Sequence, residues 1–111
     1  MNRPSSRLPP QYRQLQRRLA RLGYVSQGSV LERAPSQQGS RYIWTRKVKA
    51  KTITVALSQQ QYRWLRRAVK NQRRLGSIVQ RMQVLSRRIL FSEIVGVHRR
   101  KKLGNKALGV N

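Results

Sequence analysis

Few residues in this chain have side chains suited to catalysis. His98 is the only histidine, Glu32 and Glu93 are the only acids, and cysteine is absent. A two-metal phosphoryl-transfer site needs several converging carboxylates, and a serine triad needs a histidine oriented by an acid. No glycine-rich phosphate loop precedes a helix, and nothing marks one of the tyrosines as a nucleophile. The sequence therefore predicts a protein that is not an enzyme, with no metal site and no cofactor.

The charged residues instead indicate a polyanionic partner. The chain of 111 residues contains 26 Lys and Arg against 2 Asp and Glu, which gives a formal net charge of +24. Two carboxylates cannot neutralise this excess, so the compact chain repels itself unless a dense anion lies beside it. Nucleic acid fits this role best, because Lys and Arg displace the counterions condensed on its phosphates.

The residues that could contact phosphates fall into three groups. The first is on a predicted hairpin, the second on a predicted helix, and the third in the two ends of the chain. The four helical residues are spaced four, three and four, so they share one face. The candidates are Arg41, Thr45, Lys47, Lys49 and Lys51 (with Thr54), then Arg63, Arg67, Lys70 and Arg74, then Arg99, Arg100, Lys101 and Lys102.

Apolar periodicity predicts the elements that must position these groups. From Pro10, apolar residues recur at helical spacing as far as Leu22, and Gly23 ends the helix. Residues 28–33 could form a short strand. Residues 41–48 and 52–57 alternate as two further strands joined in a hairpin. Ala50 suits the positive φ of a two-residue turn poorly, so a longer loop is the alternative.

The alternation in residues 41–48 assigns the two faces of the hairpin. Tyr42 and Trp44 share the face that should pack against a helix, which favours a core role for them over stacking on bases. Arg41, Ile43 and Thr45 lie on the opposite face, which should be exposed. Gln37 and Gln38, in the loop before this strand, are expected to be solvated, with contact to bases as the weaker alternative.

A long basic helix should follow the hairpin. Ser58 and Gln61 have the spacing of a capping box, and the apolar residues after them form a stripe opposite the basic one. At Gly76 the apolar stripe shifts by about a third of a turn, which predicts a helix that bends or breaks there and ends near Leu90. The apolar run from Leu75 to Ile89 could be core, or a seam for self-association or a partner protein.

These elements make one α+β domain over residues 10–90, between a flexible basic arm, 1–9, and a mobile basic tail, 91–111. The sequence contains no apolar run of about 20 residues, so no membrane span is expected. We expect an intracellular protein, cytoplasmic or nucleoid-associated. The Arg- and Ser-bearing, acid-free start of the chain also fits a transit peptide, so organelle targeting is an alternative.

Residues 23–90 resemble a family of small basic prokaryotic proteins, some of them encoded near transposases and other mobile elements. The matching features are LGY, GSVLER, RYIWTRKVKAKTITVALS and QQQYRWLRRAV. Many members have a Cys-bearing knuckle in the loop that reads APSQQGS in this chain, and a Gly in the hairpin turn where this chain has Ala50. The resemblance implies the same fold and a mobile-element context, and it implies no particular activity. Because the loop has no Cys in this chain, any metal site of the family is expected to be lost here.

The predicted fold class is therefore α+β: an N-terminal helix, an antiparallel meander of two or three strands, and a long C-terminal basic helix. The leading functional hypothesis is a DNA-binding accessory or regulatory protein that binds mainly through phosphate contacts. The alternative is a structural RNA-binding protein of a ribosome or similar particle. A basic domain that docks on an acidic protein is a third, weaker hypothesis. No small-molecule substrate is expected.

Overall fold

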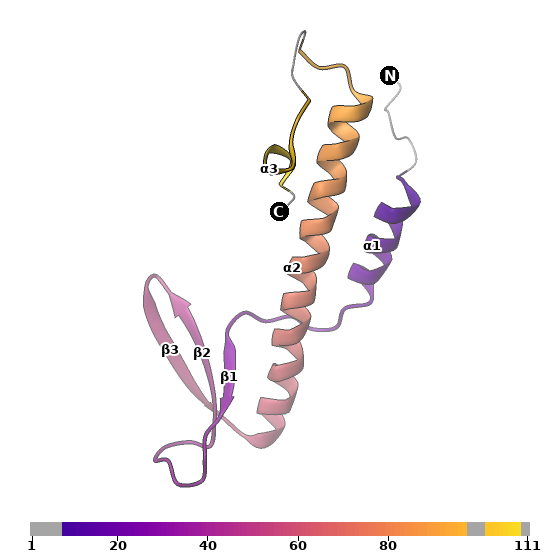
Figure 1. Ribbon diagram of the computed structural model, residues 1–111. Helices are drawn as coiled ribbons and strands as arrows, with labels where there is room; N and C mark the ends of the chain where they lie inside the picture. Colours follow the sequence, from indigo (N-terminus) through magenta and orange to yellow (C-terminus); the bar gives the residue numbers. More distant parts are fainter. Residues whose placement is uncertain (1–7, 98–101, 110–111) are drawn as a thin grey trace. The chain divides into compact units, whose positions relative to one another are not determined.

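The computed structural model describes residues 8–97 and 102–109 of the chain. Their elements follow the order α1 (Pro10–Ala20), β1 (Ser29–Glu32), β2 (Tyr42–Val48), β3 (Lys51–Leu57), α2 (Gln59–Glu93) and α3 (Asn105–Leu108) (Figure 1). The predicted α+β class is confirmed, with three strands in the meander. The chain divides into two compact units, one of Leu22–Leu75 and one of Met1–Arg21 with Gly76–Asn111. The single domain expected for residues 10–90 stays a prediction.

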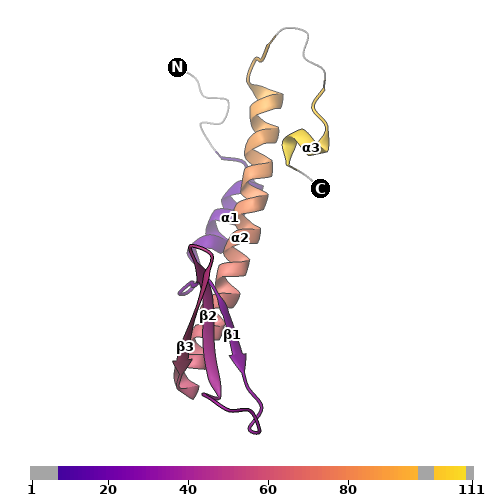
Figure 2. The ribbon, with the colours of Figure 1, turned by 90° about the vertical axis from the view of Figure 1, so that its left-hand side faces the viewer.

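The first unit, Leu22–Leu75, contains the sheet and the first half of α2. Its strands pair antiparallel in the order β1-β2-β3, beside α2 in both ribbon views (Figures 1 and 2). The ring of Tyr42 in β2 contacts that of Tyr62 in α2, with centroids 4.7 Å apart. Because side chains alternate along a strand, this contact confirms that Tyr42 and Trp44 share the face toward α2.

Ile43 corrects one expectation for the opposite face of β2. It is only 7% exposed, the most buried residue of the sheet, although the alternation placed it on the outer face. In the register, Ile43 lies between Leu31 of β1 and Ala56 of β3. A residue of a central strand has cross-strand neighbours on both sides, and periodicity within a single strand does not reveal them.

The turn between β2 and β3 has two residues, so the longer loop considered above is not formed. Val48 pairs with Lys51, and both intervening residues have positive φ, 48° at Lys49 and 66° at Ala50. These angles are typical of the type I′ turn, whose twist matches that of the strands it joins. Ala50 therefore occupies a left-handed conformation in which a Cβ is unfavourable.

Helix α2 begins with the predicted capping box. The Gln61 backbone N–H donates to Ser58 Oγ at 3.1 Å, and the Ser58 backbone N–H donates to Gln61 Oε1 at 2.9 Å. The helix then continues through Gly76 to Glu93, 35 residues in all, so the break considered at Gly76 is not found. An isolated glycine costs only about 1 kcal/mol in a helix, and Ile78, just beyond it, is 3% exposed.

The second unit combines α1, the second half of α2 and α3. Among its described residues, Leu15 of α1 and Ile78 of α2 are buried, and α1 lies alongside the second half of α2 in both views (Figures 1 and 2). Part of the apolar run Leu75–Ile89 is thus covered within the unit. Its role in self-association stays a prediction.

Helix α3 lies within the segment expected to be a mobile tail. Arg87 donates to the carbonyl of Leu108 at 3.0 Å and Gln80 to that of Gly109 at 3.1 Å. The sequence reading missed these contacts, because a run of four helical residues is too short to produce a periodic pattern.

Candidate nucleic-acid interface

The predicted basic residues of α2 form one exposed face of the helix. We call Arg63, Arg67, Lys70 and Arg74 the helix stripe; all four are exposed. On the other side of α2, Ala68 and Val69 are buried and Leu65 is half-buried. The stripe therefore faces away from the side of α2 that packs against the sheet. At 1.5 Å rise per residue, it places four cations along about 16 Å of helix.

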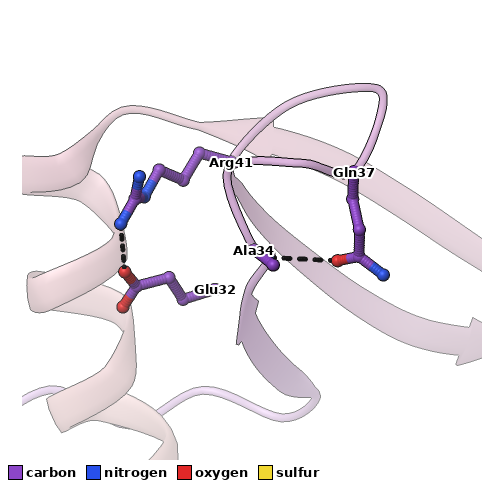
Figure 3. Close-up of polar contacts among 4 residues, drawn as sticks. All are labelled: Glu32, Ala34, Gln37 and Arg41. Atoms are coloured by element: carbon purple, nitrogen blue, oxygen red, sulfur yellow. Dashed lines mark hydrogen bonds and ion pairs between the residues drawn. The ribbon is translucent and has the colours of Figure 1, made fainter.

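In residues 8–97 and 102–109, no acid forms an ion pair with the helix stripe. Among the residues that the structure describes, the one ion pair joins Arg41 to Glu32 at 2.9 Å (Figure 3). Arg66 and Arg73, also exposed on α2, widen the positive surface beside the stripe. Six cations of one helix thus lie close together with no counter-charge among the described side chains, an arrangement that favours binding of an external anion.

Arg41 differs from the other candidates because Glu32 already binds its guanidinium. The hydrogen bond to Glu32, followed by the electrostatic effect of Tyr42, raises the pKa of Arg41 above its ordinary value. Arg41 therefore stays charged throughout the physiological range, but part of its charge is compensated. Both partners are about half exposed, so the pair contributes little to stability.

The loop before β2 is closed by its own hydrogen bonds. Gln37 Oε1 accepts from the backbone N–H of Ala34 at 3.1 Å (Figure 3). The guanidinium of Arg33 donates a hydrogen bond to the carbonyl of Gln38 at 3.1 Å. The backbone N–H of Arg33 donates to the carbonyl of Arg41 at 2.6 Å. The oxygen of the Gln37 amide is thus engaged within the loop, although the residue is exposed.

The hairpin presents its charge at the turn. Lys47, Lys49 and Lys51 are exposed, whereas Thr45 is half-buried and Thr54 is exposed. These lysines and the helix stripe are separate groups, because the hairpin contacts α2 through Tyr42 and the stripe is on the other side of that helix. The structure therefore does not unite the predicted residues in a single site.

The third predicted group is mostly outside the described residues. Arg99, Arg100 and Lys101 lie there, as does His98, while Lys102 is described and exposed. Lys102 belongs to the other compact unit. Their contribution to binding stays a prediction.

The sequence reading missed a pair of aromatic residues beside the helix stripe. Tyr24, in the linker 22–28 before β1, contacts Trp64 of α2 with ring centroids 4.9 Å apart. Tyr24 is 73% exposed and Trp64 48% exposed. Trp64 precedes Arg67 by three residues, which makes the two neighbours on the helix surface. The one signal was Trp64 itself, an aromatic residue outside the apolar stripe of its helix.

The described part of the chain lacks two further features. It contains no group of three or more His, Cys, Asp or Glu side chains that could hold a metal ion. None of its helices combines the length and the apolar character that crossing a membrane requires. No protein-family model, curated protein sequence or solved structure was found to match the chain.

Proposed function

We propose that this protein is a non-enzymatic nucleic-acid-binding protein that holds backbone phosphates on the helix stripe of α2. The observation that carries the proposal is the separation of charge from core on that helix. Four exposed cations face away from buried Ala68 and Val69, and no carboxylate in the described part of the chain pairs with them. The helix thus presents its cations as one row on the face opposite its buried residues, instead of as scattered surface charges.

The spacing of the stripe suits a phosphate backbone. One strand of B-DNA carries a phosphate about every 3.4 Å along its axis, so about 16 Å of helix spans about five phosphates. Arg63, Arg67 and Arg74 can each form two parallel hydrogen bonds to a phosphate, whereas Lys70 acts as a point charge. The lysines at the hairpin turn would add a second contact to a longer polymer.

We favour DNA as the polymer, with an accessory or regulatory role near a mobile element. That context rests on the sequence resemblance alone, and a DNA partner would place the protein in the cytoplasm or at the nucleoid. Binding through phosphates suits structured RNA equally well, since both polymers carry the same charge along the backbone. A structural role in a ribonucleoprotein particle is therefore the competing function.

A competition between a DNA hairpin and an RNA hairpin of the same sequence and loop distinguishes these functions. We expect the protein, bound to the labelled DNA hairpin, to be released less readily by the unlabelled RNA hairpin than by the unlabelled DNA hairpin at the same salt concentration. The comparison must be made at one ionic strength, because affinity for either polymer falls steeply with salt. Stronger competition by the RNA would replace the DNA assignment with the ribonucleoprotein one.

A further inference from the structure

Tyr24 and Trp64 form an aromatic pair that is exposed to solvent. Tyr24 is 73% exposed and Trp64 48% exposed, and their rings are tilted at 40° with centroids 4.9 Å apart. Exposed rings next to uncompensated cations are typical of proteins that bind single-stranded nucleic acid. There, bases stack on aromatic side chains while Lys and Arg follow the backbone.

The position of Tyr24 is fixed by hydrogen bonds in the linker. Asn71 of α2 donates its side-chain N–H to the carbonyl of Tyr24 at 3.0 Å, and the backbone N–H of Ser26 donates to the carbonyl of Ala68 at 3.1 Å. The indole N–H of Trp44 donates to the carbonyl of Gln27 at 3.0 Å. The linker thus holds Tyr24 against Trp64 before any ligand binds, and a preorganised site loses less entropy on binding.

Trp64 also lines an open apolar groove of about 500 Å³. Trp44 and Val55 form part of its sheet side, and Leu65 continues its helix side. The rings therefore continue into a surface that can bury the flat faces of bases.

The cations of the helix stripe favour a nucleic acid as the ligand of the Tyr24–Trp64 pair. Arg67 lies one turn after Trp64 on the helix, and Asn71, which holds Tyr24, lies between Arg67 and Arg74 on the same side. A phosphate bound at Arg67 would bring the attached base next to Trp64. An apolar peptide could fit the rings, but it would gain nothing from the four cations beside them.

We propose that Tyr24 and Trp64 form a stacking site for unpaired nucleobases, so that the preferred polymer has a single-stranded segment whose phosphates lie on the helix stripe. This inference rests on the proposed function and narrows its substrate class. Bases within a duplex are already stacked on one another, so only unpaired bases can use the site.

The test compares three polymers with the full-length protein. They are an oligothymidylate of about 12 nucleotides, an abasic strand of the same length, and a duplex of the same length. We expect oligothymidylate to bind more tightly than the abasic strand and to quench tryptophan fluorescence. Trp64→Leu should lower affinity for oligothymidylate by roughly 5- to 150-fold, the loss typical of one stacked base, and leave affinity for the duplex and the abasic strand nearly unchanged.

Two further variants provide a second test of the site and a control. Tyr24→Leu removes the other ring of the pair at a more exposed position and should give the same selective loss; it replaces Trp64→Leu if that variant does not fold. Tyr12→Leu, which removes a half-buried aromatic of α1, should change none of the three affinities.

The outcomes separate this inference from the function on which it rests. Equal losses for all three polymers, or equal affinities of wild type for oligothymidylate and the abasic strand, would overturn the stacking site and leave phosphate binding intact. Failure of the wild type to bind any of them would overturn the proposed function itself. Polyuridylate, added as a fourth polymer, then shows whether RNA or DNA is preferred. Tighter binding of oligothymidylate than of polyuridylate supports DNA. Tighter binding of polyuridylate overturns the DNA assignment while supporting the stacking site.

Discussion

Replacing Arg67, Lys70 and Arg74 by Gln should flatten the dependence of binding affinity on salt. Each phosphate contact with B-DNA contributes about 0.9 to the slope of log affinity against log salt concentration, so the loss of three contacts should reduce that slope by about 2.7. The ratio of wild-type affinity to variant affinity should then fall roughly 40-fold between about 0.05 and 0.2 M salt. Fluorescence anisotropy with a labelled duplex over this range measures the slope directly.

The structure offers a control with the same change in net charge. Arg13, Arg17 and Arg21 are exposed on or just after α1, in the other compact unit. Their joint replacement by Gln should leave the slope close to that of the wild type. Gln has nearly the helix propensity of Arg and Lys, so neither variant should unfold its helix. If both variants flatten the slope equally, the chain binds through its overall charge and not through the helix stripe.

Gly28→Ala should destabilise the protein by about 2 kcal/mol or more. Gly28 has φ +110°, and a Cβ at this position would meet Trp44 Nε1 and lie 2.6 Å from the carbonyl oxygen of Thr45. A left-handed backbone with a side chain typically costs about 1–3 kcal/mol. In addition, displacement of Trp44 would break the hydrogen bond from its indole to Gln27, worth about 1 kcal/mol.

Gly76→Ala is the matched control and should change the stability in the opposite direction. Gly76 lies within α2, and a Cβ there meets nothing within 4 Å. Alanine should therefore raise stability by about 1 kcal/mol through helix propensity. Urea unfolding of both variants measures the two changes. Destabilisation by both substitutions, or by neither, would contradict this account of the two glycines.

The sequence predicted those elements that local chemistry determines. Pro10 begins α1, the alternation in residues 41–48 and 52–57 marks β2 and β3, and the capping box of Ser58 and Gln61 begins α2. Each signal lies within a few residues of the feature that it predicts. The helix stripe was equally predictable, because spacings of three and four determine a helical face.

What the sequence did not reveal depends on contacts between distant segments. Burial of Ile43 depends on the strands on both sides of it. The contact of Tyr24 with Trp64 joins a linker to a helix 40 positions later in the chain. The two-residue turn at Lys49 and Ala50 follows from the pairing of Val48 with Lys51, since the residues themselves disfavour it. Local rules fail where tertiary pairing imposes the conformation.

One measurement tests the central claim most directly: titration of the purified protein, freed of bound nucleic acid, into labelled DNA and labelled RNA at about 0.15 M salt. The account predicts saturable binding to at least one polymer with a dissociation constant of about 100 μM or tighter, since binding through phosphates alone typically gives about 1 to 100 μM at this salt concentration. An absence of saturable binding to every duplex, single strand and RNA hairpin would contradict it.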